Sequence, residues 1–147
     1  MMKISPTLTS AKETFSKERG TQMSNEEFCI LLMTLPAFKV ANADDNFDDE
    51  ERTLMSTLLL NLLREVYGDA VSEEQYENLV NAYLDDFHWI TSNSVHEKNL
   101  DEALSELCSD VDGLKSTVVE MMNDVAAVSE GVSEEEQTVM QQITERL

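Results

Sequence analysis

Basic residues are scarce in this 147-residue chain, which has 10 Lys and Arg against 30 Asp and Glu and a formal net charge of −20. A surface with this acidic excess repels nucleic-acid phosphates and anionic lipid head groups, so we expect no direct binding to either. Cations and basic proteins are the partners that this charge favours. Long apolar runs are also missing. Residues 58–63 fall well short of the roughly 18 to 20 residues that span a bilayer, and we expect no membrane insertion.

Glycine and proline are few, at 4 and 2 residues, and no alternating β-branched segment lies between turn residues. The sequence therefore offers no good candidate for a β-strand. A hydrophobic content of 41% argues against disorder. At this length we expect one domain. The predicted fold class is all-α, a single compact bundle of about six to seven helices.

Only two cysteines are present, Cys29 and Cys108, and they lie far apart in apolar stretches with helical spacing. Such positions are typical of small buried thiols, so we expect both to be reduced and structural. Residues 1–20 are polar and lack the apolar core of a signal peptide. These features together predict a cytoplasmic location.

Helix starts are marked by capping signals, in which a hydroxyl residue is followed three positions later by Glu or Gln. The pattern occurs at Ser24, Ser72 and Ser133. With the three-and-four spacing of apolar residues, it predicts helices over residues 24–40, 48–68, 72–90, 100–112, 114–128 and 133–147. Pro36 predicts a kink, or a break into two shorter helices, in the first of these.

The first 23 residues differ from the rest, because they hold four basic residues against two acidic ones. This polar leader, residues 1–23, either forms a short helix over residues 8–19 or stays loosely attached. The main domain then spans residues 24–147.

One segment of the sequence recurs at an offset of 85 residues. Residues 40–55 align without gaps on residues 125–140, with six identical pairs. These pairs are Val40/Val125, Ala41/Ala126, Glu50/Glu135, Glu51/Glu136, Thr53/Thr138 and Met55/Met140. In both copies a helix ends in small residues, a turn contains an acidic residue and an apolar residue, and a new helix begins with acids. We therefore expect an internal pseudo-repeat within the bundle.

The repeated turns carry a density of carboxylates that suits a hard divalent cation. Six acids occupy the eight positions from Asp44 to Glu51, and their mutual repulsion favours a bound cation. The structural alternative is that acids in a first turn stabilise the helix dipole, by roughly 0.3 to 1 kcal/mol each, and need no ligand. An EF-hand is excluded, because its loop needs glycine at position 6 and glutamate at position 12.

At these turns the chain resembles the tellurite-resistance TerB-like family, in which a small-residue helix end is followed by Asp-Gly, an apolar residue and a Glu. Glu130-Gly131 and Glu135 match this pattern in the second unit, and Asp45-Asn46 and Glu50 match it in the first. The resemblance implies an all-helical domain with two quasi-repeats, a role in stress and tellurite resistance or phage-related defence, and a metal-binding acidic face. The ligands that it implies are Asp45, Glu50, Glu130 and Glu135, with Asp44, Asp48, Asp49 and Glu134 as second choices.

Catalytic patterns are missing from the sequence. His88 and His96 are the only histidines, and without a third nitrogen or sulfur ligand they disfavour a zinc site. No Gly-rich phosphate loop or supported Ser-His or Cys-His pair occurs, so we expect neither enzyme activity nor an organic cofactor. Phe87, His88 and Trp89 at the end of a helix are interpreted as a partly buried aromatic cluster, and a partner-binding patch at Phe87 and Trp89 is the alternative.

Three functions remain open at this point. The first is a non-enzymatic, TerB-like acidic binding module that holds a divalent cation, Ca²⁺ or Mg²⁺, between the two acidic turns and docks a basic or cation-bridged protein partner. The second is an acidic DNA mimic or decoy that binds a basic nucleic-acid-binding protein, which requires acids spread over an elongated face. The third is an interaction scaffold whose acids serve solubility.

Overall fold

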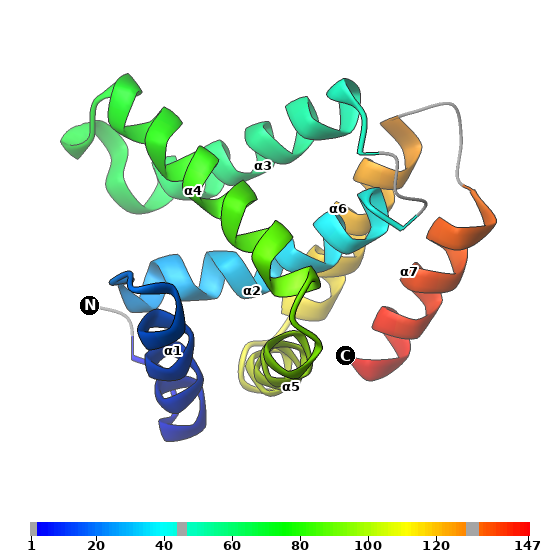
Figure 1. Cartoon of the computed structure of the whole chain (residues 1–147), viewed down its shortest axis with the longest axis horizontal. Coiled ribbons are helices and arrows are strands. Elements are labelled where there is room, and N and C mark those ends of the chain that lie inside the picture. Colours follow the sequence, from blue (N-terminus) through cyan, green and yellow to red (C-terminus); the bar gives the residue numbers. More distant parts are fainter. Residues whose placement is uncertain (1–2, 44–46, 129–132) are drawn as a thin grey trace.

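The structure is a computed structural model that describes residues 3–43, 47–128 and 133–147. These residues form seven α-helices and one short 3₁₀ helix, and no strand occurs among them. The helices are α1 (Pro6–Arg19), α2 (Asn25–Ala41), α3 (Asp49–Tyr67), η1 (Gly68–Ala70), α4 (Glu73–Thr91), α5 (Ser94–Asp110), α6 (Leu114–Val128) and α7 (Glu134–Arg146) (Figure 1). The predicted all-α bundle of six to seven helices is confirmed. No helix within the described ranges is both long enough and apolar enough to cross a membrane.

Four helices begin with a capping box. At α2, α3, α4 and α7 the side chain of the N-cap residue accepts a hydrogen bond from the backbone amide three positions later, and the Glu or Gln at that position accepts one from the N-cap amide. The N-cap residues are Ser24, Asp48, Ser72 and Ser133. Each box pairs two amides that the helix itself leaves unsatisfied. The predicted helix starts are therefore correct at these four places.

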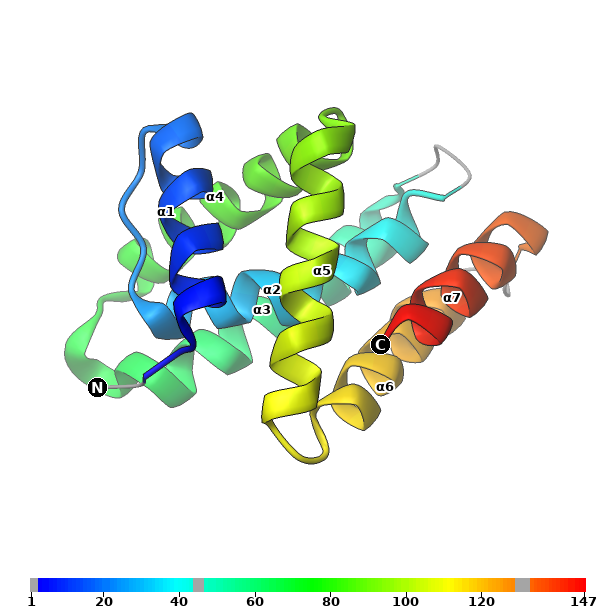
Figure 2. The same ribbon diagram turned by 90° about the horizontal axis from the view of Figure 1, so that it is seen from below.

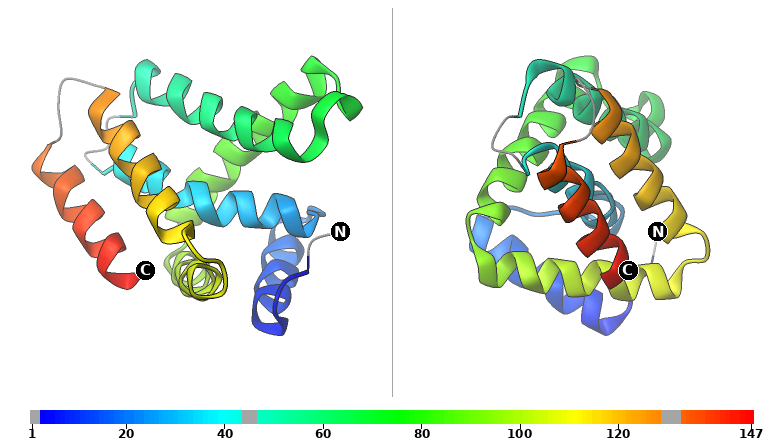
Figure 3. Two further views of the ribbon diagram at one scale, coloured as in Figure 1. Left: turned by 180° about the vertical axis from the view of Figure 1, so that it is seen from behind. Right: turned by 90° about the vertical axis from the view of Figure 1, so that its right-hand side faces the viewer.

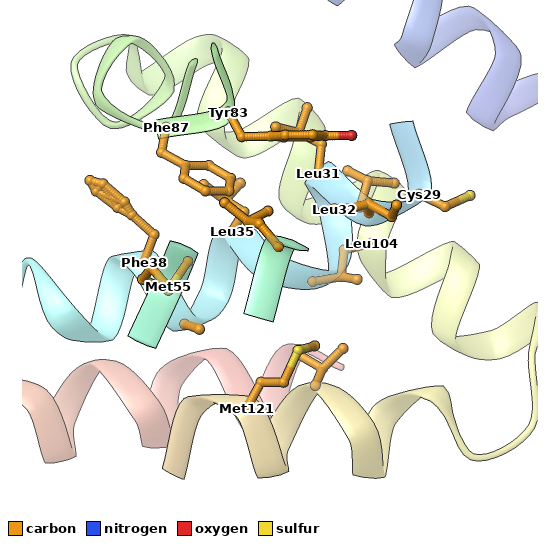
Figure 4. Packing of buried hydrophobic residues seen from close by; sticks show 14 of the residues in the cluster. Cys29, Leu31, Leu32, Leu35, Phe38, Met55, Tyr83, Phe87, Leu104 and Met121 are labelled. Carbon is orange, nitrogen blue, oxygen red and sulfur yellow. The ribbon is translucent and has the colours of Figure 1, made fainter. Parts of the chain in front are cut away.

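Helix α2 is the buried centre of the bundle. Twelve of its 17 residues are buried, and it contacts all six other α-helices. A helix that is apolar on every side needs neighbours on every side. Figure 4 shows Leu35 and Phe38 of α2 packed near Phe87 of α4 and Met55 of α3. The rings of Phe38 and Phe87 meet edge to face at a centroid distance of 5.2 Å.

Of the two alternatives predicted at Pro36, a kink or a break into two helices, the break does not occur. The element is continuous from Asn25 to Ala41 with Pro36 inside it. Proline in a helix interior costs about 3 kcal/mol, because it removes one amide donor and crowds the preceding turn. The apolar side chains on both sides of Pro36 are buried by six surrounding helices. Their burial outweighs the local cost of the proline.

The polar leader forms helix α1, and this helix is docked rather than loosely attached. Leu8 and Phe15 are 1% and 2% exposed and belong to the same hydrophobic cluster as the rest of the bundle. At the end of α1, Arg19 Nε donates to Asp86 Oδ1 at 2.9 Å and Arg19 Nη2 donates to Asp85 Oδ2 at 3.0 Å, both on α4. Helix α1 is thus fixed by apolar contacts and by ion pairs.

The internal repeat takes the form of two helix pairs, the first unit (α2 and α3) and the second unit (α6 and α7). Helices α2 and α6 pack on each other at the centre, while α3 packs on α6 and α7 packs on α2. The N-caps Asp48 and Ser133 are separated by the repeat offset. The carboxyl ends of α2 and α6 and the amino ends of α3 and α7 lie at one end of the molecule (Figures 1 and 3).

Neither cysteine is in a disulfide, as expected. Cys29 on α2 is buried, and Cys108 on α5 is half-buried. Burial raises the pKa of the Cys29 thiol to about 11. This thiol is therefore protonated at neutral pH and has a packing role.

Candidate cation site at the paired turns

The two acidic segments, residues 42–51 and 127–136, are called the paired turns below. Their described parts, residues 42–43 and 47–51 in the first and residues 127–128 and 133–136 in the second, lie at the same end of the molecule (Figure 3). Two of the four predicted ligands, Asp45 and Glu130, lie outside the described residues, as does the second-choice ligand Asp44. The other two, Glu50 and Glu135, are the second residues of α3 and α7. Both are exposed. The structure therefore places Glu50 and Glu135 at equivalent positions in the two units.

The second-choice ligands are divided between capping and solvent. Asp48 is the N-cap of α3, and its Oδ1 accepts a hydrogen bond from the Glu51 amide at 2.8 Å. Asp49 and Glu134 are the first residues of α3 and α7, and their side chains are exposed. Asp48 is thus engaged by the helix start, whereas the carboxylates of Asp49 and Glu134 face water.

Most identities of the repeat have a structural explanation. The Val-Ala pairs that end the inner helices, residues 40–41 and 125–126, have no exposed surface. Thr53 and Thr138 donate their hydroxyls to the carbonyls of Asp49 and Glu134, at 2.8 and 2.9 Å. Met55 is fully buried in the core, and Met140 packs against the core. These pairs would recur in any two units that share this helix–turn–helix geometry.

Glu51 and Glu136 also have a structural role, and sequence reasoning did not single them out as site residues. Glu51 is 3% exposed and Glu136 is 4% exposed. The Oε1 atom of each accepts a hydrogen bond from the amide of its own N-cap residue at 3.2 Å. The capping pattern in the sequence predicts these hydrogen bonds, but nothing in it predicts the burial.

Only one carboxylate oxygen of Glu136 takes part in the capping box. Its Oε2 atom is buried and has no hydrogen-bond partner among the described residues. A buried polar atom without a partner costs about 1 to 3 kcal/mol, and more for a charged group. Such an atom is commonly satisfied by a bound water molecule or a cation.

Glu50 and Glu135 are the one identical pair without a role in packing or hydrogen bonding. Neither forms a hydrogen bond or an ion pair with another described residue, and both are exposed. Their only structural contribution is to the dipoles of α3 and α7, which any acid in the first turn would supply. The ligand role that the sequence predicts for these two residues stays a prediction.

The aromatic patch predicted at Phe87 and Trp89 is not a surface patch. Phe87 has no exposed surface and lies in the core (Figure 4), because it belongs to the apolar face of α4 that packs on α2. It cannot contact a partner on this surface. Trp89 is half-buried and meets Phe15 edge to face, with Arg19 5.2 Å from its ring centroid.

The histidines are placed against aromatic rings rather than against each other. His88 lies 4.8 Å from the ring of Phe38, and His96 lies 4.9 Å from the ring of Trp89. No group of three or more His, Cys, Asp or Glu side chains suited to a metal ion occurs within residues 3–43, 47–128 and 133–147. These described ranges include only two of the four predicted ligands, Glu50 and Glu135.

The comparisons with known proteins yield no match, whether with a family model, a curated protein or a solved structure. The resemblance to the TerB-like family therefore stays a prediction based on the two turn motifs.

Proposed function

We propose that this protein is a non-enzymatic acidic binding module of the TerB-like type. In this proposal the paired turns hold a divalent cation, and the cation-bound end of the molecule docks a basic or cation-bridged protein partner. The observation that supports it most is the placement of Glu50 and Glu135. They are identical in the two units, occupy the same helix position, lie at the same end of the molecule and have no other role.

The chemistry of the paired turns supports a hard cation such as Ca²⁺ or Mg²⁺. Their donors are carboxylate oxygens, which these ions prefer. The carboxyl ends of α2 and α6 lie at the same end of the molecule, and the carboxyl end of a helix carries a partial negative charge and unpaired carbonyls. The Oε2 atom of Glu136, which has no partner among the described residues, is a further oxygen in the first turn of α7. A bound cation would neutralise the repulsion among these acids.

Thermal unfolding with and without metal tests this proposal. Saturating Ca²⁺ at about 100 times the dissociation constant adds about 2.7 kcal/mol of stability, which raises the Tm of a chain of this size by about 5 to 10 °C. The double variant Glu50→Gln with Glu135→Gln should lose this rise. The same loss is expected for Asp45→Asn with Glu130→Gln.

A control variant that removes the same number of charges elsewhere on the surface distinguishes a specific cation site from general screening of the protein's net charge. Glu74 on α4 and Glu120 on α6 are exposed acids outside the paired turns, and the double variant Glu74→Gln with Glu120→Gln should keep the full rise. An equal loss in this control would mean that Ca²⁺ acts only on the net charge. No rise with Ca²⁺, Mg²⁺ or Mn²⁺ at about millimolar concentration would contradict the proposal.

The DNA-mimic function stays a second candidate, because exposed acids are not confined to the paired turns. Glu65, Asp69, Glu74 and Glu77 are exposed around the junction of α3, η1 and α4, which lies at the opposite end of the molecule (Figure 1). A mimic should displace duplex DNA from a basic DNA-binding protein. Its competition should weaken steeply with salt and be unchanged by a chelator. Competition that requires Ca²⁺ would favour the cation-dependent module instead.

A further inference from the structure

A second candidate site lies away from the paired turns, in a groove between α1 and α5. Figure 2 shows the two helices side by side and antiparallel. The groove has a volume of about 670 Å³, which is within the range of small-molecule sites. Six residues of α1 between Pro6 and Phe15 and six residues of α5 between His96 and Glu106 line it.

The groove has an apolar floor and polar walls. Phe15, Leu100 and Ala103 line its base and are at most 3% exposed. The polar side chains that line it are Thr7, Ser10 and Thr14 from α1 and His96, Asn99, Glu102 and Glu106 from α5. No Lys or Arg is among the described lining residues. This combination suits a ligand with an apolar body and cationic ends.

Glu106 lines the groove and is half-buried. Its Oε2 atom is buried and has no hydrogen-bond partner among the described residues. A buried carboxylate oxygen without a partner is costly, and such groups call for a water, an ion or a ligand. The terminal torsion of a glutamate is broad and two-fold, so either oxygen of Glu106 can turn towards a cation in the groove.

The spacing of the two acids defines the ligand further. Glu102 and Glu106 are four residues apart on α5, so they lie on one face of the helix and are separated by about 6 Å along its axis. An aliphatic chain of four carbons holds two ammonium groups at a similar separation. Its methylene groups would then cover the apolar floor of the groove.

The groove is already formed, because α1 is held on the bundle at several points. Lys12 Nζ donates to Asn25 Oδ1 at 2.7 Å, and Arg19 pairs with Asp85 and Asp86. Burial raises the pKa of Asp86, although the Arg19 guanidinium favours its charged form. A ligand therefore does not have to order the groove, which favours binding.

We propose that the groove between α1 and α5 binds an aliphatic diamine or polyamine. The ammonium groups bind the carboxylates of Glu102 and Glu106, and the carbon chain lies on the floor formed by Phe15, Leu100 and Ala103. This site is separate from the paired turns, and it does not depend on the proposed cation function.

Calorimetric titration with 1,4-diaminobutane and spermidine tests the proposal. The buffer contains a chelator to remove divalent cations and about 0.15 M salt to screen the general attraction of cations to an acidic surface. We expect one site per chain. Glu106→Gln should weaken binding about 10-fold or more, because an ammonium group loses its charged partner. Glu102→Gln should act in the same way. Glu120→Gln, an equal change of charge on α6, should change the affinity less than about twofold.

Two further measurements locate the binding. Ser10→Leu fills the groove without changing the charge and should abolish binding. Trp89 is the only tryptophan and contacts His96, which lines the groove, so its fluorescence should change on titration. Equal weakening by Glu120→Gln, equal binding of n-butylamine, or no diamine binding at about 1 mM would overturn the proposal. So would binding of a lysine-containing peptide without binding of the diamine.

Discussion

The two repeat units share the chemistry of their turns but differ in how deeply they are buried. In the first unit, α2 buries twelve residues and α3 buries Met55, Leu59 and Leu63 together with Glu51. In the second unit, α6 buries six residues, while α7 buries only Glu136. The capping box and the threonine hydrogen bond are nevertheless the same in both. The two units therefore share the helix start but not the extent of burial in the core.

The position of each unit in the bundle explains this difference. Helix α2 is surrounded by six helices, whereas α7 packs mainly on α2 and α6 at the edge of the bundle. Val139, Met140 and Ile143 of α7 are only half-buried against the core. Equivalent substitutions in the two units should therefore have unequal effects where they touch the core and similar effects where they touch the turn.

The largest inequality is expected at the identical methionines. Met55→Ala removes a side chain with no exposed surface and should lower the free energy of unfolding by about 2 to 5 kcal/mol. Met140→Ala removes a half-buried side chain and should cost less than about 1.5 kcal/mol. Urea unfolding of both variants measures the difference. Equal losses would contradict the view that the first unit carries the core.

Thiol labelling compares the protection of α2 with that of an outer helix. Cys29 is buried and its pKa is raised to about 11, while Cys108 is half-buried. Because the thiolate is the reactive form, Cys29 should react more than about 100-fold more slowly than Cys108 in the native protein. The labelling rate of Cys29 should rise with pH towards 11. In a Cys108→Ser variant only Cys29 can be labelled, so the rate of Cys29 is measured alone. Fast labelling in that variant would contradict the burial of α2.

Removal of the caps should affect the two units more evenly. Ser133→Ala removes the hydroxyl that accepts a hydrogen bond from the Glu136 amide. This change should lower the free energy of unfolding by about 1 kcal/mol. Asp48→Ala should lower the free energy of unfolding at least as much, since the Asp48 carboxylate accepts a hydrogen bond from the Glu51 amide in the same way. Ser116 lies in α6 and is exposed, so Ser116→Ala should change stability by less than about 0.5 kcal/mol. A negligible loss at Ser133 would show that its capping box does not stabilise α7.

The smallest effect is expected when Glu136 is replaced by glutamine. The capping box is kept, because Gln75 fills the same position at the start of α4. The substitution also removes a buried carboxylate whose Oε2 has no described partner. Without metal, Glu136→Gln should therefore change the free energy of unfolding by less than about 0.5 kcal/mol. A loss as large as that of Glu136→Ala would mean that the charge itself stabilises the turn.

Prediction from the sequence succeeds where local chemistry decides the structure. The capping boxes at Ser24, Ser72 and Ser133 locate three helix starts correctly. Helix α5 begins at Ser94 rather than near residue 100. The sequence does not predict this start, because the first turns of the helix are polar and its N-cap residue makes no side-chain hydrogen bond. The start of α1 at Pro6 does have a local signal, a serine cap followed by proline.

Prediction fails where tertiary packing decides. Pro36 remains inside one helix because α2 is surrounded. Phe87 is different, because its spacing with Tyr83 and Leu84 on the apolar face of α4 already indicates that it lies in the core. The burial of Glu136 has no sequence signal, since periodicity assigns a charged residue to the solvent side. Of the candidate site, the sequence locates the two turns, but it does not show that they share one end of the molecule.

A double-mutant cycle on Ca²⁺ affinity tests the central claim, that the two turns act together on one cation. Calorimetry would give the affinities of the wild type, Glu50→Gln, Glu135→Gln and the double variant. If both carboxylates bind one ion, the effects are non-additive, and a coupling energy of about 1 kcal/mol or more is expected. Additive losses within about 0.5 kcal/mol, or no Ca²⁺ binding by the wild type, would contradict the claim.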